Sequence, residues 1–156
     1  MRFPDWPERL TAYVEARRNL PHVWGENDCV QFAGGALEAM TGANPFAQWR
    51  GTYATQEEAT AILLAEGGFV TALHRLLGKP VAPLQAMRGD LLFGELRPGQ
   101  EGLAVCIGPA AVAPGWRHVI RSPKKDDNGQ LTGQIATVPA LAFLPRERFR
   151  IAFQVL

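Results

Sequence analysis

Cys29 is the residue of this chain with the clearest chemical potential. It follows a Trp-Gly turn at residues 24–28, and an apolar helical pattern begins directly after it. A thiolate is the reactive form of cysteine, and the N-terminus of a helix favours negative charge and offers free N–H groups to a substrate oxyanion. Cys29 is therefore a candidate nucleophile, with Trp24, Gly25 and Asp28 supporting its position. The alternative is a small, buried apolar residue that faces the rest of its helix.

A cysteine nucleophile needs a base, which is normally a histidine, and the chain has three. His118 lies downstream of Cys29 in a segment of strand character, so it is a candidate base or an ordinary polar strand residue. His22 precedes the Trp-Gly turn and is a second candidate, or part of a packed entry segment. His74 lies beside Arg75 on an expected helix, and we expect it to be a surface or partly buried helix residue.

Cys106 has a different setting, because it lies inside the apolar run 103–107. We expect a structural role for it, and the sequence leaves open whether it lies near Cys29. The histidines and cysteines form no close ligand pairs, and neither an HExxH nor a CxxC spacing occurs. We therefore expect no metal and no cofactor.

Composition narrows the classes of protein that remain. The net charge of +1 argues against nucleic-acid binding by bulk charge and against a highly charged disordered chain. The 156 residues, 47% of them apolar, suit a single domain over residues 1–156. No apolar run approaches the roughly 20 residues that span a bilayer, and the first ten residues do not resemble a signal peptide. We expect synthesis in the cytoplasm and free thiols.

The pattern of elements predicts an α+β domain in which N-terminal helices pack on a mostly antiparallel sheet. Asn27 or Asp28 can cap the second helix, and Thr55 with Glu58 has capping-box spacing for the third. Asp90 is expected to cap or to bond the backbone in a turn before the first strand. The predicted helices are residues 4–18, 28–41, 55–66 and 69–77, and the predicted strands are 91–93, 103–107, 110–113, 116–121, 134–138 and 149–155, with a charged hairpin tip at 124–129.

The run from Val23 to Ala33 resembles the nucleophile helix of NlpC-type cell-wall peptidases, which are papain-like cysteine hydrolases. It is more similar still to a phage and prophage branch of small tail-associated peptidases. The resemblance extends over about residues 20–110 and implies a papain-like NlpC-type fold with Cys29 as the nucleophile. The motifs that carry it, in the order of that branch, are Thr41-Gly42, Arg50-Gly51-Thr52-Tyr53, Gly67-Gly68, Arg88-Gly89-Asp90 and the strand Leu103–Gly108.

This chain departs from the family at the position of the base. In the active peptidases the catalytic His opens the strand after the Gly-Asp turn, and Gly102-Leu103 stands there in this chain. The third polar residue of the family would fall near residues 113–115, which are apolar as well. Either His118 or His22 substitutes from another position, or the site is inactive.

The resemblance implies a tail-tip component of a phage or prophage particle, possessing a degenerate peptidase fold and packed against other tail-tip or hub proteins in the virion tail. The alternative is an active thiol endopeptidase or amidohydrolase that uses Cys29 on peptidoglycan during cell-wall penetration. A free-standing cytoplasmic domain, or a binder of a small amide, is left open. We expect no nucleic-acid partner and no membrane span.

Overall fold

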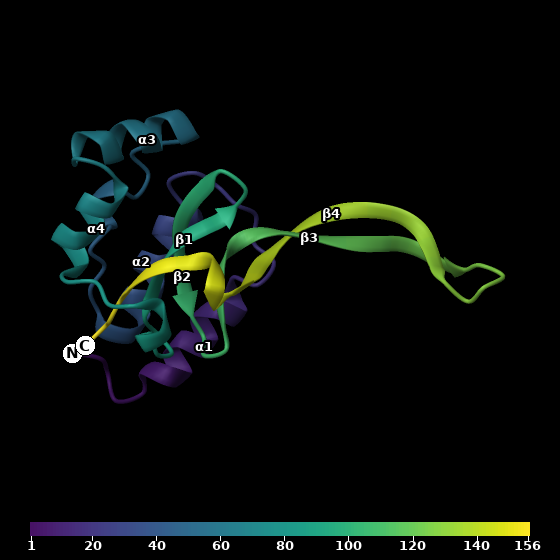
Figure 1. Cartoon of the computed structure of the whole chain (residues 1–156), viewed down its shortest axis with the longest axis horizontal. Coiled ribbons are helices and arrows are strands. Elements are labelled where there is room, and N and C mark those ends of the chain that lie inside the picture. The colour runs from purple at the N-terminus through teal and green to yellow at the C-terminus, as the bar shows by residue number, and fades with distance from the viewer.

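The computed structural model describes the backbone of residues 1–156 and every side chain except those of His118 and Ile120. Helices come first and strands afterwards, as predicted (Figure 1). The helices are α1 (Trp6–Ala16), α2 (Cys29–Thr41), α3 (Gln56–Ala65) and α4 (Phe69–Leu77), with short 3-10 turns η1 (Ala47–Trp49), η2 (Pro83–Gln85) and η3 (Arg146–Arg148). The strands are β1 (Leu91–Arg97), β2 (Gln100–Cys106), β3 (Ala110–Lys125), β4 (Leu131–Pro145) and β5 (Phe149–Phe153).

The strands form one antiparallel sheet in the order β4-β3-β2-β1-β5. The α+β fold class with helices on an antiparallel sheet is thus confirmed. The prediction of separate strands at 110–113 and 116–121 is wrong, because both belong to the single long strand β3. Pro114 and Gly115 do not interrupt β3, since β2 no longer pairs with the strand there and a free edge tolerates proline.

Helix α2 lies at the centre of the body because its sequence is apolar on nearly every side. Gly35 lets α1 approach closely, since a Cβ on Gly35 would lie 2.2 Å from the Tyr13 hydroxyl. Gly42 ends the helix in the left-handed conformation, and its N–H returns to the carbonyl of Glu38. The sequence of small residues on α2 therefore determines how tightly the two helices pack.

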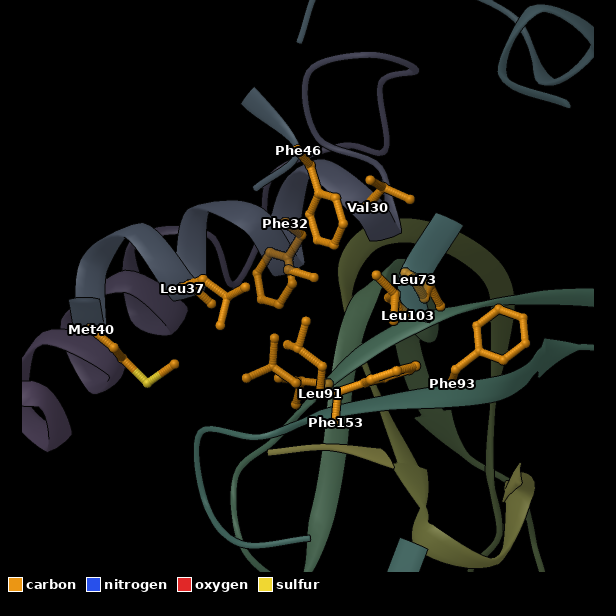
Figure 2. Packing of buried hydrophobic residues seen from close by; sticks show 14 of the residues in the cluster. Val30, Phe32, Leu37, Met40, Phe46, Leu73, Leu91, Phe93, Leu103 and Phe153 are labelled. Carbon is orange, nitrogen blue, oxygen red and sulfur yellow. The ribbon is translucent and has the colours of Figure 1, made fainter. Parts of the chain in front are cut away.

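The main hydrophobic core lies between the helices and one face of the sheet. Figure 2 shows Phe32 and Leu37 of α2 directed toward Leu91, Leu103 and Phe153 of the strands. A second, smaller cluster covers the opposite face of the sheet and contains Leu92, Ala104, Cys106, Ala111 and Phe149. Because one cluster lies on each face of the sheet, the central strands β1 and β2 are buried on both faces.

Asp90 fastens the two ends of the chain to the body. Its carboxylate is buried and pairs with Arg2 at 2.7 Å. The backbone N–H groups of Met87 and Val155 also donate to it, at 2.8 and 3.0 Å. Asp90 thus bonds the backbone as predicted, and the two termini lie side by side (Figure 1).

Strands β3 and β4 continue beyond the sheet as a two-stranded ribbon, which we call the arm (residues 114–141). The last register pair that β3 makes with β2 is Val105 with Val112, whereas β3 and β4 remain paired out to Lys125 and Leu131. The arm projects away from the body and from the two termini (Figure 1). Its charged tip is a turn closed by a hydrogen bond from the Asp126 N–H to the Gln130 carbonyl, which confirms the predicted hairpin tip.

The structure also bears on membrane insertion. Within the described part of the chain, no single helix has the length and apolar character needed to cross a membrane, and α3 with α4 meet those criteria only as a pair bent by 63°.

Candidate active site around Cys29

Cys29 is the first residue of α2, and Asp28 caps that helix. One oxygen of the Asp28 carboxylate accepts hydrogen bonds from the N–H groups of Val30 and Gln31, both at 2.9 Å. The other oxygen accepts from the Gly25 N–H at 2.8 Å and from the Tyr53 hydroxyl at 2.6 Å. Asp28 therefore fixes the start of α2 to the preceding turn and to the segment before α3.

Gly25 can be no other residue in this arrangement. Its φ is +78°, and a Cβ there would lie 2.2 Å from the Tyr53 carbonyl oxygen. The turn thus brings the backbone of residue 25 against that of residue 53. Trp24 and Tyr53, which this contact brings together, line the same pocket as Cys29.

The electrostatic surroundings of the thiol oppose its ionisation. Burial raises the pKa of Cys29 to about 12, and the neighbouring Asp28 carboxylate adds to that rise. The N–H of Leu103 and the N–H groups at the helix start act in the other direction, as expected for a helix N-terminus, but they are outweighed. At neutral pH the residue is a protonated thiol.

Gly102, for which the sequence resemblance implies a histidine in active peptidases, lies directly against this thiol. A Cβ built on Gly102 would be 2.8 Å from the Cys29 sulfur and 2.7 Å from the Leu96 methyl group. Leu96 occupies that neighbourhood and supplies no group that can accept a proton.

The first histidine named as a candidate base, His118, lies in the arm opposite Thr137, and its side chain is outside the described residues. The second, His22, is half-buried between Trp24 and Trp116, with ring centroids 4.7 and 5.8 Å away. Burial lowers the pKa of His22, Asp28 opposes this, and Arg97 lowers it further. The described contacts of His22 include no hydrogen bond to Cys29.

Cys29 lines a pocket of about 120 Å³ that opens beside the start of α2. Its walls are mainly apolar and come from α2 and the turn before it, from the segments around η1 and α3, and from α4 and the first residues of β2. Of this lining, the sequence predicted only Trp24, Asp28 and Cys29 as site residues, because the other residues come from distant segments that only the fold brings together. The full lining is Trp24, Asp28, Cys29, Val30, Trp49, Tyr53, Gln56, Ala59, Thr60, Ile62, Leu63, Phe69, Gln100 and Glu101.

The two cysteines are not joined by a disulfide. Cys29 packs against the main core, whereas Cys106 belongs to the cluster on the opposite face of the sheet, so the sheet separates them. Of the side chains that the structure describes, no three from His, Cys, Asp and Glu lie together in a way that could hold a metal ion.

These features define an α+β domain with a protonated cysteine as the first residue of its central helix, whose start is capped by Asp28. The chain belongs to the family described as a domain of unknown function, DUF6950, which matches residues 1–155. No curated protein matches the chain in sequence. Among solved structures it is similar to the NlpC/p60 domain of the peptidoglycan hydrolase SagA, with 17% identity, a TM-score of 0.49, and coverage of 96% of this chain and 98% of that one.

Proposed function

We propose that this protein is a tail-tip component of a bacteriophage or a prophage-derived particle that uses an NlpC-type peptidase fold as a structural unit and does not hydrolyse peptide bonds. The observation that carries the second half of this proposal is Gly102, which lies against the Cys29 sulfur where the family requires a histidine. Without a positioned base, the usual contribution of about 10²- to 10⁴-fold to the rate is lost. A thiol with a pKa of about 12 does not compensate, because so little of it is thiolate at neutral pH.

The assignment to a phage tail is supported by the ordered motifs that resemble the tail-associated branch, from the nucleophile helix to the strand that ends at Gly108. The arm is in keeping with this role, because a ribbon that leaves the body exposes surface suited to contact with neighbouring subunits. On this proposal the protein is incorporated in the virion tail beside other tail-tip or hub proteins. Its function there is to contact them, and contact with peptidoglycan is secondary.

An active thiol peptidoglycan hydrolase is the second candidate, and one observation favours it. Cys29 is partly exposed on the wall of an open pocket, with the Leu103 N–H and the N–H groups of the helix start directed at its sulfur. Such donors are suited to stabilise an oxyanion during acyl transfer. This arrangement could act only if a base entered from elsewhere.

Digestion of purified sacculi separates the two candidates. Wild type and Cys29→Ala should release the same background of peptide fragments, measured by mass spectrometry, while an active NlpC-type hydrolase serves as the positive control. Release by wild type that is abolished in Cys29→Ala would overturn the non-hydrolytic proposal and establish the second candidate.

The tail assignment has its own test. Particles produced without this protein should show missing or malformed tail tips in electron micrographs, and Cys29→Ala should restore normal tips as well as wild type does. Intact, infectious tails in the absence of the protein would rule out the structural role.

A further inference from the structure

The arm carries exposed apolar side chains on one of its faces. Side chains alternate between faces along a strand, so Leu131 and Ile135 share a face of β4. Trp116 lies on the same face, since it pairs across the ribbon with Pro139. These three residues, which we call the arm stripe, are 60%, 70% and 42% exposed in the order Leu131, Ile135, Trp116. Large apolar groups gathered in this way on one surface mark a contact site.

Positive charge borders the arm stripe. At the root of the arm the Arg97 guanidinium lies over the Trp116 ring, 4.7 Å from its centroid. Near the tip, Lys125 pairs with Leu131 and therefore belongs to the face of the stripe. Three further cations, Arg117, Arg121 and Lys124, lie on the opposite face, from which long side chains reach the edges of a narrow ribbon.

Acidic groups do not balance these cations along the arm. Of the side chains that the structure describes, none of the five cations takes part in a salt bridge, and the acidic residues of the arm are Asp126 and Asp127 in its tip. The surface therefore has an apolar centre and a basic rim. Protein interfaces have the same anatomy, with an apolar centre and a polar rim, so the complementary surface is apolar with an acidic rim.

The edges of the arm are poorly suited to pairing with a further strand. Pro114 and Pro123 lie on β3 and Pro139 lies on β4, and proline has no N–H to donate to an added strand. A partner must therefore pack across the face of the ribbon. Two strands about 4.8 Å apart, with their side chains, offer a face whose width matches the roughly 10 Å diameter of a helix.

We propose that the arm stripe is the docking site for an acidic amphipathic helix of another protein. Its apolar face would cover Trp116, Leu131 and Ile135, and its flanking carboxylates would meet Arg97 and Lys125. A two-stranded ribbon alone is only marginally stable in water, so such a contact also stabilises the arm. The inference rests on the proposed tail function only for the identity of the protein that supplies the helix.

Fluorescence anisotropy with the full chain tests the proposal. The probe is a labelled helical peptide of about 20 residues, long enough for about 30 Å, with leucines on one face and glutamates on both flanks. It should bind with an affinity that falls as salt rises, and a matched peptide with lysines in place of the glutamates should bind at least about tenfold more weakly. Equal binding of both peptides, or no binding of the acidic one, would overturn the proposal.

Variants of the arm make the test specific. Leu131→Ser with Ile135→Ser should weaken binding of the acidic peptide at least about tenfold without changing the melting temperature, because both side chains are exposed. Arg97→Glu with Lys125→Glu should reverse the preference toward the lysine peptide. Lys79→Glu is the matched control, since Lys79 is an exposed cation on the body, and it should leave the preference unchanged.

The remaining outcomes are also decisive. Tighter binding to duplex DNA or to anionic lipid vesicles, lost in the same arm variants, would show that the arm recognises phosphate groups and would overturn the helix proposal. Cys29→Ala should bind the acidic peptide as wild type does. The two proposals therefore fail separately. Loss of peptide binding to the arm would contradict this inference, whereas hydrolysis of peptidoglycan would contradict the proposed function.

Discussion

At the scale of single residues, Cys29 illustrates how position and environment can act against each other. The start of a helix favours a thiolate by a small amount, typically about 0.3 to 1 kcal/mol when exposed. Burial and the carboxylate of Asp28 act in the opposite direction and raise the pKa to about 12. The residue therefore has the location of a nucleophile and the ionisation behaviour of a core thiol.

The pKa of Cys29 predicts a loss of stability in alkali. The folded-state pKa is about 12 and the ordinary value is 9.0, so the folded protein holds this proton more tightly. The stabilisation is fully present below about pH 9 and is lost as the pH rises from there toward 12. Urea titrations at several alkaline pH values should show a steeper loss of unfolding free energy for wild type than for Cys29→Ala. Parallel pH profiles for the two proteins would contradict the prediction.

Substitution of Gly102, at the same site, is predicted to lower the stability of the protein. In Gly102→Ala the new methyl group meets the Cys29 sulfur and the Leu96 methyl group at under 3 Å, so both side chains must shift. We expect a loss of about 1–3 kcal/mol of stability, measured by urea unfolding. Gly99→Ala is an informative control, because its Cβ would meet open space and its cost would come from the positive φ alone. A Gly102→Ala variant as stable as wild type would show that the site is not tightly packed.

At the residue scale, the sequence was enough to predict those site residues that belong to short local motifs. The cap Asp28 and the turn Gly25 could be inferred from the local residues, whereas only the resemblance to the peptidases pointed to residue 102 as part of the site. The high pKa of the thiol could not be inferred, because it depends on burial. The role of Tyr53 could not be inferred either, because its hydrogen bond to Asp28 spans 25 positions of the chain.

At the scale of elements, α2 and α3 differ in how firmly they are held. Most of α2 is buried between α1 and the sheet, whereas α3 has no buried residue and contributes partly exposed side chains to the pocket wall. Its start is secured by Thr55, whose hydroxyl accepts a hydrogen bond from the Glu58 N–H. The pocket beside Cys29 is therefore built from one rigid wall and one loosely attached wall.

Hydrogen exchange should reveal this difference. Elements with few buried apolar contacts open at low free energy, so the amides of α3 should exchange much faster than those of α2. Mass spectrometry of the exchanging protein measures both helices in one experiment. Thr55→Ala, which removes the cap at a cost of about 1 kcal/mol, should speed exchange in α3 and leave α2 unchanged. Equal protection of the two helices would contradict this description of the pocket.

The elements that were predicted best are those with clear signals at both ends. Helix α4 has the predicted limits, since glycines flank it, and α2 follows its cap closely. Alternation along residues 149–155 predicts Phe149, Ile151, Phe153 and Val155 on one face of the last strand, but in the structure Phe149 packs in the second cluster. A bulge in the pairing of β5 with β1 causes this difference, because the register shifts between Ile151 and Phe149.

At the scale of the whole molecule, Asp90 binds both ends of the chain to the body, and the arm projects from the body away from those ends. The ion pair of Asp90 with Arg2 joins the first residues to the turn before β1, and the Val155 N–H joins the last residues to the same carboxylate. The length of the arm could not be predicted from the sequence, because glycine and proline within β3 suggested interruptions. Pairing with β4 is what keeps that strand continuous.

Asp90 predicts a large effect on stability. Asp90→Asn would leave the Arg2 guanidinium without its charged partner in a mostly buried setting, which costs about 3–5 kcal/mol. Asp5→Asn is the matched control, since the pair of Asp5 with Arg9 is exposed to solvent and contributes little to stability. Thermal unfolding of the two variants should therefore differ clearly. Similar melting temperatures would show that Asp90 does not hold the termini.

Because the two termini lie side by side, the chain can be circularly permuted. A short glycine linker can join Leu156 to Met1, because both ends are held beside the same carboxylate, and the hairpin tip at Asp126–Gly129 offers an exposed place to open the chain. Exposed tips with few tertiary contacts tolerate such cuts. A circular permutant that begins at Asn128 and ends at Asp127 should therefore fold to the same body, with two separate strands extending where the arm was.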